Sequence, residues 1–377
     1  MKIAQVAPLV ESVPPRGYGG TERIVSYLTE ALVEQGHDVT LFASADSITS
    51  SDLVPCAKRA LRLDPDAADP TPHMVLMLER IRTRASKFEI LHFHIDYWHF
   101  PMFRTRPNKT LTTLHGRQDL PEMQTFYSEF SEMPLVSISD AQRAPIRHAN
   151  FLATVHHGLP RNLYRPVTTP QCGYLAFLGR ISPEKRCDRA IAIAKAAKMP
   201  LKIAAKVDKV DRAYFHEVVV PLLDDPLVEH IGEIEQREKN DFLANAAALL
   251  FPIDWPEPFG LAMIESMACG TPILAFNRGS VPEIVEDGTN GYRVSTVEEA
   301  VSKLGAVLAL DRGKVRGCFD ERFTADRMAS DYVKLYESLL KPDKAPQSDE
   351  LTIRLRGAHQ TTQDEIRPVD PKAADAA

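Results

Sequence analysis

Short apolar runs alternate with helical segments along most of this chain, and that alternation restricts the fold more than any other feature. Residues 2–43 contain one complete unit, in which the apolar runs "KIAQVAP" and "DVTLFA" flank a Gly-rich loop and a segment from Thr21 whose apolar residues recur at helical spacing. Four further runs follow, "EILHFH", "LTTLHG", "PLVSIS" and "FLATVHHG". Apolar strands separated by helices predict a parallel sheet covered by helices on both faces.

A second series of the same kind begins near Gly173 and extends to about residue 294, with the runs "GYLAFLGR", "PLKIAA" and "AAALLFPI". The Pro- and Gly-rich stretch "GLPRNLYRPVTTPQCG" lies between the two series and indicates an interdomain linker. At 377 residues the chain is long enough for two domains. We therefore expect an α/β protein with two Rossmann-like, doubly wound parallel-sheet domains, at 1–165 and 170–325, that face each other across a ligand-binding cleft.

The end of the chain differs from these two series. The segment 326–340, "DRMASDYVKLYESLL", is amphipathic and is expected to form a closing helix. The chain then becomes polar and Pro-rich, which predicts a disordered tail over 341–377. No internal repeat is evident beyond the similarity of the two series.

Charge and cysteine content argue against several classes of function. The net charge of −6 disfavours nucleic acid as the main partner, because phosphate binding needs a basic surface, whereas a local basic patch for peripheral membrane association stays open. No apolar run approaches the ~20 residues that span a bilayer, and the N-terminus lacks the anatomy of a signal peptide. The five scattered cysteines have no CxxC spacing, so we expect a cytoplasmic protein without structural zinc.

The segment "PEPFGLAMIESMACGTP", residues 256–272, places two glutamates around seven uncharged residues. Glu257 is expected in a loop, and Glu265 about one and a half turns into a helix that begins near Gly260 and is apolar nearly all round. A buried carboxylate without partners is costly, so Glu265 must accept hydrogen bonds. A ribose diol would supply two donors, and an internal Arg or a neighbouring loop is the alternative. The unpaired N–H groups at the helix start would bind an anion, which Gly260 allows to approach closely.

This segment resembles the E-x7-E motif of the retaining glycosyltransferases of family 4, which have the GT-B fold. The resemblance spans residues 1–340 and includes, in the family's order, "GYGGTER", "LHG", "HHGLP" and "FLGRISPEKRCDRAI". It implies an enzyme that needs no cofactor or metal ion and moves a hexose from a nucleotide-diphosphate sugar, such as UDP-glucose, to a hydroxyl of a glycan, lipid or small molecule. A nucleotide-sugar 2-epimerase and a non-catalytic nucleotide-sugar-binding protein on the same fold are the alternatives.

The resemblance also implies roles for individual residues. Arg180 and Lys185 would neutralise the donor diphosphate and the charge that develops on the leaving group. Glu265 would hold the ribose and Glu257 the sugar hydroxyls, and the family places the residue that matches His115 near the donor sugar. The expected catalytic residues are thus His115, Arg180, Lys185 and Glu257. The expected nucleotide-sugar-binding residues are Gly19, Gly20, Arg180, Lys185, Lys206, Ile231, Phe259, Gly260, Leu261 and Glu265.

Two other patterns suggest metal chemistry at first sight. His92 and His94 alternate on "LHFH" and would share one strand face, but spacing places no third ligand beside them. Asp64 and Asp66 form a D-x-D pattern, but they lie in the Pro- and Asp-rich stretch "LDPDAADPTP", which is typical of a turn. We therefore expect no metal site.

Overall fold

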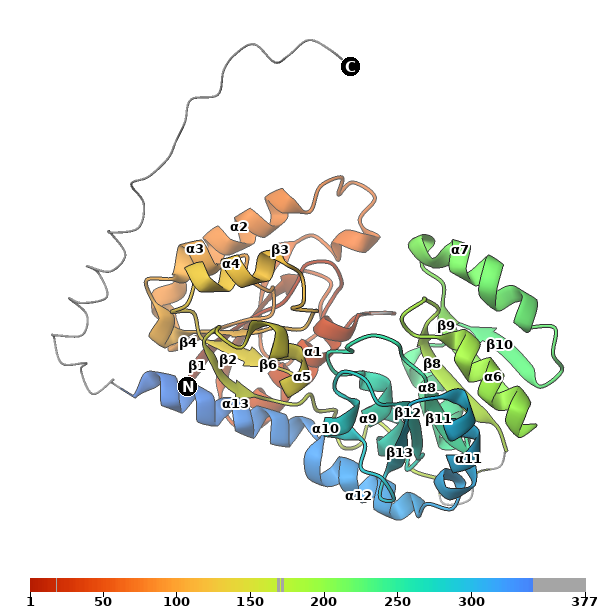
Figure 1. The fold of residues 1–377 in the computed structure, drawn as a ribbon. Helices are drawn as coiled ribbons and strands as arrows, with labels where there is room; N and C mark the ends of the chain where they lie inside the picture. Colours follow the sequence, from red (N-terminus) through yellow and green to blue (C-terminus); the bar gives the residue numbers. More distant parts are fainter. Residues whose placement is uncertain (18, 168–169, 171–172, 342–377) are drawn as a thin grey trace, which may run out of the picture.

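The computed structural model describes residues 1–17, 19–167, 170 and 173–341, and Figure 1 shows its ribbon. The segment 342–377, which makes up nearly all of the tail predicted to be disordered, lies outside the described residues, as do four residues of the predicted linker. Among the described residues, no helix combines the length and the apolar character needed to cross a membrane.

The first half of the chain forms a seven-stranded sheet in which all neighbouring strands are parallel. In spatial order the strands are β3 (Asp52–Ala57), β2 (Asp38–Ser44), β1 (Lys2–Val6), β4 (Ile90–Phe93), β5 (Thr110–Thr113), β6 (Leu135–Ser137) and β7 (Phe151–Thr154). The helices of this half are α1 (Gly20–Glu34), α2 (Thr71–Arg82), α3 (Phe100–Phe103), α4 (Glu122–Glu129) and α5 (Asp140–Arg143). The central strand β4 is buried along its whole length, which explains why its sequence does not alternate between apolar and charged residues.

The second half forms a six-stranded sheet that is also parallel throughout. Its strands in spatial order are β10 (Val228–Gly232), β9 (Leu201–Lys206), β8 (Leu175–Arg180), β11 (Ala248–Phe251), β12 (Ile273–Phe276) and β13 (Gly291–Val294). Its helices are α6 (Cys187–Ala197), α7 (Arg212–Tyr214), α8 (Gln236–Ala244), α9 (Leu261–Ala268), α10 (Val281–Ile284), α11 (Val297–Leu308) and α12 (Arg312–Arg322). The two sheets confirm the predicted doubly wound α/β class.

The strand order places the site at the centre of each sheet. The order reverses direction between β1 and β4 in the first sheet and between β8 and β11 in the second. Loops leave neighbouring strands in opposite directions at such a point, so a crevice opens there at the carboxyl ends of the strands.

The last helix, α13 (Ala325–Leu340), returns from the second half to the first and packs against α1. Figure 1 shows it in blue beside the elements of the first half, while α12 stays with the second. Its fully buried side chains Tyr332 and Tyr336 belong to the same apolar core as Leu28 of α1 and Met263 of α9. This core is therefore continuous between the two halves.

Candidate active site

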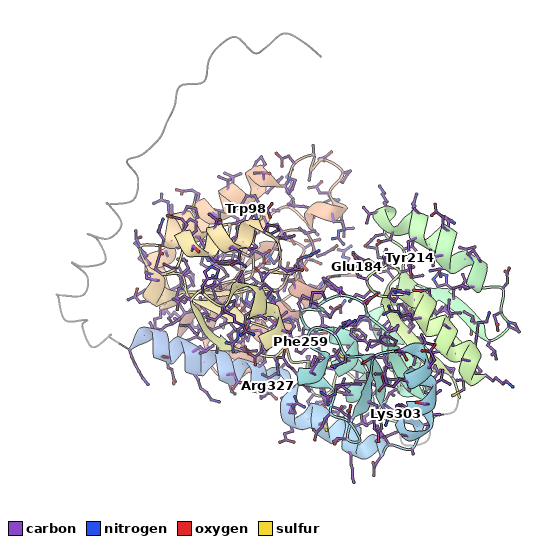
Figure 2. All side chains as sticks on the ribbon, viewed as in Figure 1. Trp98, Glu184, Tyr214, Phe259, Lys303 and Arg327 are labelled. Atoms are coloured by element: carbon purple, nitrogen blue, oxygen red, sulfur yellow. The ribbon has the colours of Figure 1, made fainter. Side chains whose placement is uncertain are left out.

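A cleft of about 930 Å³ separates the two halves at the carboxyl ends of their strands. In Figure 2, Phe259 and Glu184 lie in the region where the halves face each other. The predicted site residues on its walls are Gly19, Gly20, His115, Arg180, Lys185, Lys206, Glu257, Phe259, Gly260, Leu261 and Glu265. Ile231 is not among the wall residues; it lies on the edge strand β10 and is 37% exposed, and the following residues 233–236 line the cleft instead.

The helix α9 begins directly after Gly260, whose φ of +81° lies in the left-handed region. A Cβ at this position would come within 2.8 Å of the Phe251 ring and 2.9 Å of the Met263 side chain. Glycine is therefore required both by the backbone conformation and by packing. The next two residues, Leu261 and Ala262, line the cleft, so the first N–H groups of α9, which lack acceptors within the helix, lie at its wall.

Glu265, on α9, is only 3% exposed and has two partners within the chain. Its Oε1 accepts hydrogen bonds from Tyr164 Oη and from Lys239 Nζ, both at 2.9 Å. Of the alternatives left open by the sequence, the chain itself thus supplies two partners to one oxygen, and neither of them is an arginine. Burial opposes the negative charge, but Lys239 and the nearby Arg23 outweigh it and lower the pKa of Glu265. Its Oε2 accepts no hydrogen bond from any described residue, so this oxygen is available on the cleft wall.

Arg23, which the sequence analysis missed, connects this carboxylate to the first half. It lies in the first turns of α1, is 8% exposed, and donates to Gly17 O at 2.7 Å and to Gln236 Oε1 at 2.8 Å. Gln236 in turn donates to Tyr164 Oη at 2.7 Å. The network ties the glycine loop before α1 to the start of α8, so both halves orient the groups around Glu265.

Glu257 is neutralised in the same way as Glu265, by a lysine at one oxygen. Its Oε2 accepts a hydrogen bond from Lys185 Nζ and another from Trp255 Nε1 at 2.7 Å. No described residue donates to Oε1. The Glu257 backbone packs directly against Gly279, where an added Cβ would lie 2.3 Å from Glu257 N. Lys185, which is predicted to bind the diphosphate, and Glu257, which is predicted to bind the sugar hydroxyls, are thus directly hydrogen-bonded to each other.

Arg180, at the end of β8, lies among three carboxylates. Its guanidinium is 3.3 Å from Asp211, 3.7 Å from Asp208 and 3.9 Å from Glu184. Lys206, at the end of β9, also pairs with Asp208, at 2.9 Å. The sequence analysis did not anticipate this, because Asp208 and Asp211 follow a different strand and only the sheet brings them beside Arg180.

A buried chain of hydrogen bonds fixes the proton positions on His115. Gln5 Oε1 lies 2.8 Å from Nε2 of His94, and because a carbonyl oxygen only accepts, His94 carries its proton on Nε2. The unprotonated Nδ1 of His94 then accepts from Nε2 of His115, 2.9 Å away. Burial lowers the pKa of His115 to about 3, so the ring is neutral. Its Nδ1 is left as a hydrogen-bond acceptor.

The amide of Gln5 is itself oriented by α13. Its Nε2 donates to Tyr336 Oη at 3.2 Å and lies 3.4 Å from His92 Nδ1. His92 uses both ring nitrogens, with Tyr336 Oη 2.7 Å from Nδ1 and Thr113 Oγ1 2.8 Å from Nε2. Over the part of the chain that is described, no group of three or more His, Cys, Asp or Glu side chains could hold a metal ion. His92 and His94 therefore belong to the hydrogen-bond chain that orients His115.

Family models, a sequence relative and a solved structure that resemble this chain are described as glycosyltransferases. A family model described as "Glycosyltransferase Family 4" matches residues 18–210, and one described as "Glycosyl transferases group 1" matches residues 170–316. D-inositol 3-phosphate glycosyltransferase of Mycolicibacterium smegmatis is 24% identical over 382 aligned positions, which cover 83% of this chain and 86% of that protein. The crystal structure of AviGT4, a glycosyltransferase involved in avilamycin A biosynthesis, matches 90% of this chain and 98% of its own, with a TM-score of 0.71 and 23% identity. The complex of Anabaena HepE with UDP-glucose matches 90% of this chain and all of its own, with a TM-score of 0.66 and 17% identity.

Proposed function

This chain belongs to glycosyltransferase family 4, and on that basis we propose that it transfers a hexose from a UDP sugar, preferably UDP-glucose, to an acceptor hydroxyl with retention of configuration and without a metal ion. Its two facing parallel sheets are the GT-B fold. The observation that carries the proposal is the arrangement of Glu257 and Glu265 on one cleft. Each carboxylate is neutralised by a lysine at one oxygen, and the other oxygen has no partner among the described residues.

The donor fits between these two open oxygens. The ribose hydroxyls donate to Oε2 of Glu265, and the sugar hydroxyls donate to Oε1 of Glu257. The diphosphate then lies at the start of α9, beside Arg180 and Lys185. An ammonium group has three donors, so Lys185 can keep its hydrogen bond to Glu257 and still donate to a phosphate oxygen. The UDP-glucose complex of the structural neighbour HepE supports the choice of donor.

The chemistry follows from charge and proton positions. The bond between the anomeric carbon and the phosphate oxygen breaks, and Arg180, Lys185 and the N–H groups of α9 stabilise the negative charge on the departing diphosphate. The acceptor oxygen bonds to the anomeric carbon on the face that the diphosphate leaves, and a phosphate oxygen takes the acceptor's proton. The neutral His115 accepts a hydrogen bond from a sugar hydroxyl through Nδ1. No covalent enzyme intermediate is needed.

A panel of nucleotide sugars tests this function. UDP-glucose, UDP-N-acetylglucosamine and GDP-mannose are compared by thermal shift in the presence of EDTA, and UDP release is then followed with a mixture of hydroxyl acceptors. We expect UDP-glucose to give the largest shift, UDP release without added metal, and a product whose anomeric configuration by NMR equals that of the donor. An inverted product, or release that requires a divalent cation, would contradict the proposal.

A further inference from the structure

A second cavity, of about 400 Å³, opens in the first half next to the cleft. We call it the side cavity; its walls include Leu61, Met74, Asp96 and Trp98. His115, Thr21 and Gly116 line both the side cavity and the cleft, so the two spaces meet there. Because the proposed function places the donor sugar beside His115, a molecule in the side cavity lies next to the anomeric carbon. Its volume falls in the range of ~300–1,000 Å³ that small-molecule sites occupy.

The side cavity offers an apolar surface together with an aromatic face. Leu61, Met74 and Ile95 contribute aliphatic wall. Trp98 also lines it and is 48% exposed, which is unusual for so large an apolar side chain. An exposed indole presents a flat surface against which an aryl group or the C–H face of a pyranose ring can stack.

The side cavity contains one carboxyl group and, among the described residues, no cationic side chain. Of the described residues that line it, none is Lys or Arg, and the two histidines, His94 and His115, are neutral because burial lowers their pKa values. Asp96 is half-buried, and its carboxylate makes no hydrogen bond or ion pair with any described residue. Arg62, on the wall of the neighbouring cleft, is already paired with Glu11 at 2.9 Å. Hydroxyl groups of a ligand would satisfy Asp96, whereas a phosphate or carboxylate would meet like charge.

We propose that the side cavity is the acceptor site and that it selects an uncharged sugar or glycoside. The flat face of the acceptor stacks on Trp98, one of its hydroxyls donates to Asp96, and the reacting hydroxyl points toward His115. This inference rests on the proposed function, since it needs a donor sugar at the junction of the two cavities. It separates this chain from its relative that is named for a phosphorylated inositol, because no Lys or Arg among the described residues lines the side cavity to bind a phosphate.

A matched acceptor panel tests the inference. Phenyl glucoside, phenyl galactoside and phenyl mannoside are each compared with their 6-phosphates, using the donor that gives the largest thermal shift. We expect kcat/KM for the best neutral acceptor to exceed that for its phosphate by at least about tenfold. Transfer of the donor sugar to water is measured in parallel, because it reports the donor site without any acceptor.

Two substitutions test whether the acceptor binds in the side cavity. Trp98→Ala is expected to raise the acceptor KM about tenfold through loss of stacking, with the donor KM and the transfer to water unchanged. Asp96 has a φ of +51°, so Asp96→Gly removes the carboxylate while keeping a residue that adopts this conformation, and a similar rise is expected. Ile48→Ala is the matched control, because Ile48 is an apolar residue that is 79% exposed and lines neither cavity. It should change neither the acceptor KM nor the donor KM.

The outcomes separate the two proposals. If transfer to water stays intact, three results would overturn the assignment of the side cavity as a site for neutral acceptors. These are a preference for the phosphorylated acceptors, transfer to no acceptor of the panel, and an unchanged acceptor KM in Trp98→Ala. Failure to bind or turn over any nucleotide sugar would instead remove the proposed function itself, and the inference with it.

Discussion

Lys185 donates to Oε2 of Glu257 and leaves the other oxygen of that carboxylate without a partner among the described residues. Trp255 donates to the same Oε2 and thereby fixes the side chain. A lysine that is held by a carboxylate in this way is positioned before any ligand arrives. The hydrogen bond to Glu257 also orients the other two N–H groups of the ammonium, which can donate to a ligand. The pair therefore serves both the diphosphate and the sugar in the proposed site.

Replacing Lys185 tests the cationic side of this pair. Lys185→Met keeps much of the side-chain length but removes the charge, so we expect kcat to fall at least about tenfold at saturating donor, the effect of one lost charged contact. Lys195→Met is a matched control, because Lys195 pairs with Asp225 at 3.2 Å and is 44% exposed, away from the cleft. Steady-state kinetics of UDP release measures both. Full turnover in Lys185→Met would show that the ammonium is not part of the reacting site.

Gln5 is expected to act through His115 without touching the substrate. In Gln5→Leu the proton of His94 is no longer held on Nε2, so His115 loses its single tautomer, and we expect kcat to fall about tenfold with the donor KM unchanged. The ¹⁵N chemical shifts of the His115 ring should change from a protonated Nε2 to an average of two tautomers. Thr29→Val, the control, removes a buried hydroxyl that has no hydrogen-bond partner in the described structure, and it should leave both readouts unchanged. Unaltered ¹⁵N shifts in Gln5→Leu would refute the positioning role.

Gly260 allows backbone conformation and steric contact to be separated. Gly260→Ala should lower the free energy of unfolding by more than the ~1 kcal/mol typical of a left-handed backbone, because its Cβ also meets Phe251 and Met263. Gly36→Ala provides the comparison, since Gly36 has a φ of +83° but nothing within 4 Å of its Cβ position. Urea denaturation and donor KM are measured for both. Equal destabilisation by the two substitutions would contradict the packing argument.

The buried histidines predict a direction for stability against pH. Burial lowers the pKa values of His92, His94, His115 and His157 below the ordinary 6.5. Below pH 6.5 the unfolded chain binds protons that the folded imidazoles do not, so the free energy of unfolding should fall as the pH drops, by about 1.4 kcal/mol per pH unit for each imidazole. Above this value the stabilisation is complete. Thermal melts between about pH 8 and pH 5 check the trend, and a Tm that does not decrease over the acid half of that range would speak against neutral imidazoles.

The sequence was sufficient for the parallel sheets and for most of the cleft wall, because both depend on local patterns. Apolar runs mark buried parallel strands, and residues at the ends of such strands meet at one edge of a sheet. The partners of Glu265 could not be predicted, since Tyr164 lies 101 residues away along the chain and joins it only through packing. The same holds for Asp208 and Asp211 beside Arg180, and for Gln5 and Tyr336 behind His115. Ile231 lies beside a register shift in β10, which no pattern in the sequence indicates.

The central claim is that the open Oε2 of Glu265 binds the ribose of the donor. Calorimetric titration of UDP and of a UDP analogue that lacks both ribose hydroxyls, against the native protein and Glu265→Gln, tests it directly. We predict that the native protein binds UDP at least about tenfold more tightly than the analogue, and that the glutamine variant binds the two with nearly equal affinity. Equal affinity of the native protein for both nucleotides would contradict the account.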